Sequence, residues 1–139
     1  MSKLARLLVL TLSLAVLSFA SLACCNLTLT KGGPTIESAV TCKDITDDYK
    51  PVNETSTYAP EDTFYCSVKA SNLKQGQTMT WKWYHGDEFL YEQPLTLNKA
   101  GSGYVAAYLS SDQPWPQGDY RVEIFLDDVL VKTVKFSVQ

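Results

Sequence analysis

The sequence predicts an all-β fold, an antiparallel β-sandwich of seven to eight short strands over residues 35–139. Three observations support this fold class. The first is that apolar and polar residues alternate in several short runs, with no helical period after residue 23. The second is that turn signals recur about every 8–12 residues. The third observation is residues 78–84, which hold two of the three tryptophans. Because buried aromatics dominate small cores, we expect this run to be the central strand.

The side chains of residues 78–84 divide into two sets. Met79, Trp81 and Trp83 occupy alternate positions, and successive side chains of a strand point to opposite faces. This strand is therefore predicted to have one heavy apolar face. The inward positions predicted on other strands are Phe64, Cys66, Val68 and Ala70, then Tyr120, Val122, Ile124 and Leu126, and finally Val134, Phe136 and Val138.

The remaining segments give weaker patterns. Residues 36–45 alternate loosely and are predicted to form a first strand at a sheet edge. Residues 46–62 form a long polar segment with two prolines and several acids. Pro94 favours an edge position for residues 95–97, since proline cannot donate to a ladder. Residues 110–118 are predicted to be a loop.

The first 23 residues have the pattern of a secretory signal peptide. Lys3 and Arg6 give a basic start, and an uncharged, Leu-rich run from 7 to 23 ends in small residues. A transmembrane helix would need about 20 apolar residues, more than this run supplies. We therefore expect an extracytoplasmic or secreted protein.

Ala20-Ser21-Leu22-Ala23-Cys24 resembles the lipobox of bacterial lipoproteins. Ala23 is the small residue required before the modified cysteine, while Ser21 stands where the family usually has leucine. The resemblance implies lipidation of Cys24 and anchoring at the extracytoplasmic face of the cell membrane. Simple cleavage after Ala23 and free secretion is the alternative. Residues 24–34 would then be a tether, because they end in two glycines and a proline.

Residues 35–139 resemble immunoglobulin-like or fibronectin-type sandwiches, including small domains of bacterial surface lipoproteins. Trp81 follows Cys66 by fifteen residues, which is the family's Cys-to-Trp spacing, and Tyr120 takes the position of the tyrosine corner. Val122 stands where the second cysteine would be, so the family's intersheet disulfide is absent. The resemblance implies the fold but no particular activity.

Two cysteines lie in the predicted body. A secreted location permits disulfides, so we expect Cys42 and Cys66 to be joined, which would stabilise the fold by about 3 kcal/mol. Two separate buried thiols are the alternative. A metal site is not expected, because there is no Cys-x-x-Cys motif and His85 is the only histidine. The acids of residues 44–62 fit no known calcium loop.

The sequence predicts no enzyme and no cofactor. It contains no phosphate-binding glycine loop and no Gly-x-Ser-x-Gly, and His85 falls in a predicted exposed turn with no marked nucleophile. Nucleic acid is not an expected partner. The net charge is −3, and loss of the signal leaves ten basic against fifteen acidic residues, whereas phosphate binding needs a basic patch.

Exposed aromatic residues are the remaining candidates for a binding site. Tyr84, Tyr91 and Trp115 are predicted ligand contacts, because Tyr and Trp are enriched at recognition surfaces. Trp115 could instead plug one end of the sandwich. The predicted function is a lipid-anchored, extracytoplasmic, non-catalytic binding or accessory module whose partner is another envelope protein or a glycan. The alternative is a freely secreted β-sandwich that binds carbohydrate through exposed aromatics.

Overall fold

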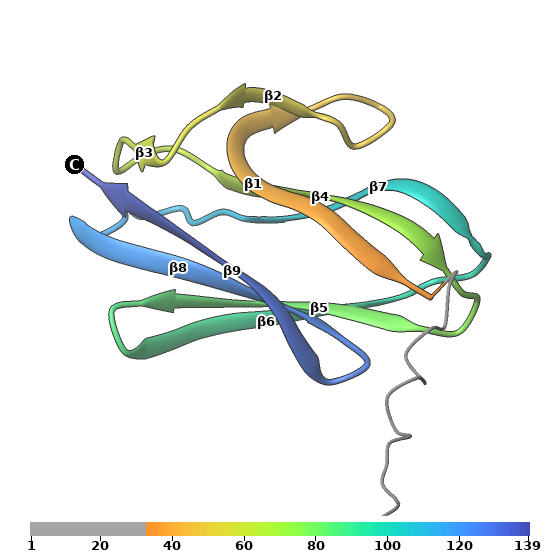
Figure 1. Cartoon of the computed structure of the whole chain (residues 1–139). Helices are drawn as coiled ribbons and strands as arrows, with labels where there is room; N and C mark the ends of the chain where they lie inside the picture. The colour runs from red at the N-terminus through yellow and green to blue at the C-terminus, as the bar shows by residue number, and fades with distance from the viewer. Residues whose placement is uncertain (1–32) are drawn as a thin grey trace, which may run out of the picture. The chain divides into compact units, whose positions relative to one another are not determined.

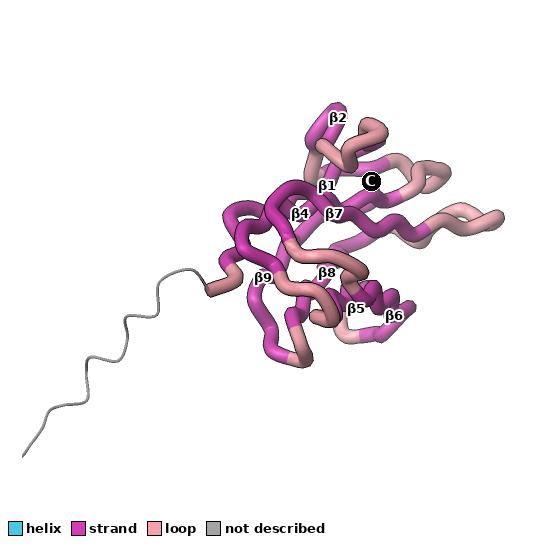
Figure 2. The backbone as a smooth tube through the Cα atoms, turned by 90° about the vertical axis from the view of Figure 1, so that its right-hand side faces the viewer, coloured by secondary structure: helices cyan, strands magenta, loops and turns pink. Residues whose placement is uncertain are grey.

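Two β-sheets face each other in the computed structural model, which describes residues 33–139 (Figures 1 and 2). The strands are β1 (Thr35–Ile45), β2 (Pro51–Glu54), β3 (Thr57–Tyr58), β4 (Phe64–Leu73), β5 (Thr78–His85), β6 (Glu88–Thr96), β7 (Gly101–Leu109), β8 (Gly118–Leu126) and β9 (Val129–Val138). The first sheet has the order β2-β1-β4-β7 and the second β3-β9-β8-β5-β6. The all-β sandwich prediction is confirmed.

The predicted signal peptide, Cys24 and nearly all of the predicted tether lie outside the described residues. Within residues 33–139 there is no helix of the length and hydropathy needed to cross a membrane. These residues form one compact unit that contains the whole aromatic core.

The strand number exceeds the prediction because the polar segment 46–62 contains two short strands. β2 folds back on β1 in antiparallel register, and β3 runs parallel to β9. The expectation that residues 36–45 form an edge strand is therefore wrong: β1 lies between β2 and β4. Short strands rich in polar residues and proline lack the alternation by which the longer ones are recognised.

The tryptophan strand is central, as predicted. Met79, Trp81 and Trp83 are 0–1% exposed. β5 lies between β6 and β8, and its register pairs Trp81 with Ile124 and Trp83 with Val122. Paired residues share a face of the sheet, so these four side chains form one apolar layer against the first sheet.

Phe64 lies at the centre of an aromatic cluster that joins the two sheets. Its ring centroid lies 4.8–6.3 Å from five other rings, and the arrangements are mostly edge-to-face or stacked. Such geometries add about 0.5–1.5 kcal/mol per pair beyond the area buried. The five partners are Tyr58, Trp83, Trp115, Tyr120 and Phe136.

The predicted edge position of Pro94 is confirmed, because β6 is the last strand of the second sheet. The β8–β9 connection is a two-residue turn in which Asp127 and Asp128 both have positive φ, 50° and 68°. Two positive φ values match the right-handed twist of a tight hairpin. A carboxylate oxygen of Asp127 also accepts the backbone N–H of Thr78 at 3.0 Å, which fixes the turn to the start of β5.

The expected disulfide between Cys42 and Cys66 is not formed: both are free and buried thiols. The antiparallel register explains this. Cys66 is paired with Thr41, and Cys42 is paired with Tyr65, so the two sulfurs belong to neighbouring positions that face opposite sides of the sheet. Cys66 lies in the core, and the Cys42 thiol points toward the Tyr65 carbonyl at 4.0 Å.

Both thiols should resist modification in the folded protein. Burial raises the pKa of Cys66 from 9.0 to about 12 and also raises the pKa of Cys42, so neither is a thiolate near neutral pH. Residues 33–139 contain only these two cysteines. We expect a chromogenic thiol reagent at pH 8 to label neither in the native state and both after unfolding in urea. If the non-reduced protein were lighter than the reduced protein by the mass of two hydrogens, the two cysteines would instead form a disulfide.

The same pKa shift predicts alkaline destabilisation. The Cys66 thiol loses its proton more readily in the unfolded chain than in the fold. Its contribution to stability is therefore fully present below pH 9.0, the ordinary pKa, and is lost as the pH rises toward about 12.

Candidate functional site

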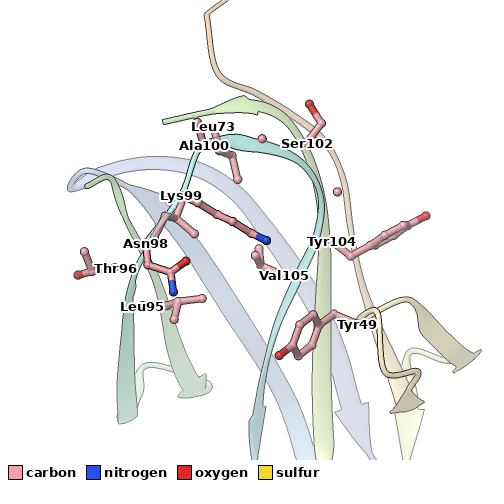
Figure 3. A pocket seen from close by; sticks show the side chains of 13 residues that line it. Tyr49, Leu73, Leu95, Thr96, Asn98, Lys99, Ala100, Ser102, Tyr104 and Val105 are labelled. Atoms are coloured by element: carbon pink, nitrogen blue, oxygen red, sulfur yellow. The ribbon is translucent and has the colours of Figure 1, made fainter. Parts of the chain in front are cut away.

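A groove of about 600 Å³ opens where the chain passes from β6 to β7 (Figure 3). The end of β6, the connection through residues 97–100 and the first half of β7 form most of its lining. Tyr49 contributes from the β1–β2 loop, far away in the sequence. Leu95 and Asn98 add an apolar and an amide surface to the same groove.

Hydrogen bonds within the β1–β2 loop hold Tyr49 in place. Its backbone N–H donates to the Thr46 carbonyl at 2.9 Å, and its own carbonyl accepts the Ser67 hydroxyl of β4 at 2.6 Å. Tyr49 has a φ of 66°, and its side chain is 51% exposed. The loop is thus fixed by its backbone while the ring remains available at the groove.

Two glycines at the start of β7 also line the groove. Gly101 and Gly103 have φ values of 153° and 152°, a region that side chains rarely adopt, and nothing lies within 4 Å of where a Cβ would be. The Ser102 hydroxyl between them accepts the Asn72 N–H at 3.0 Å. This hydrogen bond holds the start of β7 against β4, and the two glycines leave open space beside the β7 backbone.

Lys99 supplies the only charge among the residues that line the groove. Its side chain is exposed and reaches from the β6–β7 connection toward Val105 (Figure 3). A single ammonium beside tyrosine, amide and aliphatic groups favours a ligand with a negative charge and an extended or planar body.

The structure does not bring the three predicted contact aromatics together, and none of them lines the groove. Trp115 stacks on Phe64 at 4.8 Å and donates its indole N–H to the Asp62 carbonyl at 3.0 Å, so it closes one end of the sandwich. Tyr84 lies under the Arg121 guanidinium, 4.0 Å from the ring centroid. Tyr91, on edge strand β6, is 52% exposed.

Tyr49 and Lys99, which the sequence analysis did not select, come together only through the fold. One follows β1 and the other precedes β7, and neither segment has a local motif. The hydrogen bond from the Ser67 hydroxyl to the Tyr49 carbonyl holds the loop against β4.

His85 has no catalytic arrangement around it. Its ring stacks on Tyr120 at 4.3 Å, and it makes no side-chain hydrogen bond with any residue of the segment 33–139. A general base must lie within hydrogen-bond reach of its proton donor. In the part of the chain that the structure describes, no three His, Cys, Asp or Glu side chains cluster to hold a metal ion.

Tyr120 forms the predicted tyrosine corner. It is 3% exposed, and its hydroxyl donates to the Pro116 carbonyl at 2.6 Å. Burial raises the pKa of this hydroxyl, which therefore remains a donor at neutral pH. The bond ties the end of the β7–β8 loop to β8, as expected for this corner.

Tyr120→Phe should lower the free energy of unfolding by about 1–3 kcal/mol, because it leaves the Pro116 carbonyl without its donor. Urea unfolding followed by tryptophan fluorescence would measure this. Tyr108→Phe is the matched control, since Tyr108 is 54% exposed and donates no side-chain hydrogen bond within residues 33–139. Equal losses in the two variants would contradict a role for the corner.

Comparison with solved structures identifies the fold of this chain. No family model matches the sequence, and no curated protein matches it. An immunoglobulin-like protein from Pseudomonas aeruginosa superposes with a TM-score of 0.53 at 12% identity, over 76% of this chain and 96% of that one. The fold is immunoglobulin-like. At this identity the likeness establishes the architecture alone.

Two further solved structures are similar over a comparable part of this chain. The CARDB domain of a Pyrococcus furiosus protein, in complex with di-metal ions, gives a TM-score of 0.46 at 12% identity, over 79% of this chain and 96% of that one. The Pseudomonas fluorescens alkylpurine DNA glycosylase AlkC, bound to DNA, gives 0.46 at 6% identity, over 76% of this chain and 30% of the glycosylase.

Proposed function

We propose that this chain is a non-catalytic binding module, anchored by a lipid on Cys24 at the extracytoplasmic face of the cell membrane. Its ligand would occupy the groove between β6 and β7. The observation that carries this proposal is the groove itself, which Tyr49 and Lys99 both line on an immunoglobulin-like scaffold. Binding sites placed on loops over such a scaffold are common.

The ligand that suits this lining is an acidic oligosaccharide. The aromatic ring of Tyr49 offers a surface for a sugar face, and Asn98 offers an amide that both donates and accepts. The ammonium of Lys99 would pair with a carboxylate. An acidic segment of another envelope protein is the other outcome that the experiment below would reveal.

Titration of ¹⁵N-labelled residues 33–139 with galacturonate and galactose oligomers of equal length tests the groove. We expect amide shifts at residues 97–105 with the acidic sugar and weaker shifts with the neutral one. Lys99→Ala should weaken binding about tenfold, which corresponds to about 1.4 kcal/mol, because it removes a charge-assisted hydrogen bond to the carboxylate.

Lys132→Ala is the matched control, because Lys132 is an exposed lysine on β9, a strand that does not line the groove. It should leave the affinity unchanged. Shifts that spread outside the groove, or equal losses in the two lysine variants, would refute the proposed site. Silence with both sugars, followed by binding of acidic peptides that Lys99→Ala removes, would assign the groove to a protein partner.

The anchor is tested on the full chain expressed in a bacterium. We expect the mature protein to carry diacylglyceryl and acyl mass on Cys24 and to sediment with membranes. Cys24→Ser should abolish both the added mass and the membrane association, whereas Cys25→Ser should retain them. Membrane association that survives Cys24→Ser would reject lipid anchoring at this residue.

A freely secreted carbohydrate-binding protein is the second candidate. It is favoured by Tyr91, whose ring is 52% exposed on edge strand β6. Here Tyr91→Ala, and not Lys99→Ala, should remove binding to a glycan array. A mature protein without acyl mass would agree with this second candidate.

A further inference from the structure

We propose that two copies of this chain associate through the free edge of β7, in antiparallel register centred on Val105. The two sheets have four edge strands: β2, β7, β3 and β6. Edge strands normally carry features that prevent such pairing: short length, proline or charge. β2 and β3 have only four and two residues, and β6 contains Pro94, Glu88 and Glu92. β7 has nine residues, with no proline and no charge.

The register shows which backbone groups of β7 face outward. The Tyr58 hydroxyl donates to the carbonyls of Cys42 and Tyr65, at 2.7 and 3.4 Å, so the Tyr65 backbone points toward β1. Tyr108, which is paired with Tyr65, must therefore point its backbone away from β4. The hydrogen bonding of Gln93 on β6 agrees with this direction, because its side-chain amide donates to the Tyr108 carbonyl at 2.7 Å.

Backbone direction alternates along a strand, so Tyr104 and Ala106 also present their N–H and C=O groups at the free edge. Within residues 33–139 neither residue makes a backbone or side-chain hydrogen bond on that side. These four groups, two donors and two acceptors, lie at the centre of the free edge, while Gln93 pairs the Tyr108 carbonyl near its end.

A two-fold axis beside Val105 would satisfy all four groups. Tyr104 would then exchange both hydrogen bonds with Ala106 of the second copy, and the same pair would form again by symmetry. Side chains on the outer face alternate in size, since β4 pairing places Tyr104, Ala106 and Tyr108 on the face opposite the core. Each tyrosine would thus lie beside a small residue of the other strand: Tyr104 beside Ala106, and Tyr108 beside Ser102.

The absence of charged residues on β7 also permits a symmetric pair. A two-fold axis brings identical residues together, so a charge at the centre of the interface would oppose itself; β7 has no charge, and the Lys99 ammonium, which reaches toward Val105, would turn toward solvent in the pair. Four to six hydrogen bonds correspond to a total interface of roughly 400–1,200 Å², below the size of a stable dimer. The association is therefore weak in solution and would be favoured by a membrane that concentrates the chains.

Sedimentation equilibrium of residues 33–139, which contain the whole core, tests the pairing. We expect a reversible monomer–dimer equilibrium between about 10 µM and 1 mM. Ala106→Pro removes an outward N–H but no bond to β4, so it should raise the dissociation constant at least about tenfold without unfolding the domain. Ala106→Ser, which keeps the N–H, should dimerise like the wild type. Monomer throughout this range for the wild type would overturn the proposal.

Cysteine cross-linking tests the register and does not depend on how Ala106→Pro folds. In a non-hydrogen-bonded pair the Cα atoms lie about 4.5 Å apart, within disulfide range. Val105→Cys should therefore form a covalent dimer on mild oxidation. Ser102→Cys lies six residues from its own symmetry mate along the paired strands, roughly 20 Å, and should not. Equal cross-linking of both variants would overturn the register. The groove is tested by sugar binding and the pairing by Ala106→Pro, a residue that does not line the groove, so either proposal can fail alone.

Discussion

Trp83→Ala should lower the free energy of unfolding by about 3–5 kcal/mol. Trp83 is fully buried, its ring contacts Phe64 and Phe136, and its indole N–H donates to the Gln93 side chain at 2.8 Å. Removal of the indole creates a cavity between the sheets and also frees Gln93, the residue that connects β6 to β7. Urea unfolding followed by far-ultraviolet circular dichroism would measure the loss.

Tyr91→Ala is the control for this substitution. Tyr91 is paired with Trp83 across β5 and β6, yet it is 52% exposed, so its removal should change stability by less than about 0.5 kcal/mol. A cost below about 1 kcal/mol for Trp83→Ala would mean that the two sheets are not sealed around this residue.

Phe64→Ala should have an effect of similar size, about 3–5 kcal/mol, for a different reason. Its ring is in contact with rings from β3, β5, β8, β9 and the loop that contains Trp115. The loss should therefore include several aromatic pairs together with the buried area. Thermal unfolding would give the total change.

A double-mutant cycle separates these contributions. Phe64→Leu combined with Trp115→Ala should show a coupling of at least about 0.5 kcal/mol, because the two rings stack at 4.8 Å. Phe64→Leu combined with Tyr91→Ala should be additive, since Tyr91 is not a member of the aromatic cluster. Additivity in both cycles would contradict the cluster as a cooperative unit.

The layer structure could be predicted from the sequence because side-chain alternation is a local property. Met79, Trp81 and Trp83 alternate within a single strand, and the tyrosine corner requires only Tyr120 and the loop before it. The short strands β2 and β3 could not be predicted from the sequence, because four and two residues are too few to show an alternating pattern.

The groove was not predictable in the same way. Tyr49 is held at the groove by a hydrogen bond from the Ser67 hydroxyl to its carbonyl, and no local sequence pattern encodes this contact between the β1–β2 loop and β4. The sequence left Trp115 as either a ligand contact or a plug at one end of the sandwich, because the stacking partner that decides between them lies fifty-one residues away in sequence. The expected disulfide failed for a related reason: a one-residue difference in register sends the two sulfurs to opposite faces of the sheet.

The unpaired thiol in the core has a consequence for folding. Immunoglobulin-type domains commonly have a covalent bridge between their sheets, whereas here the sulfur of Cys66 is a free, buried thiol beside Trp81. No oxidation step is needed before the two layers can close. Residues 33–139 should therefore refold at the same rate in reducing and in oxidising buffer.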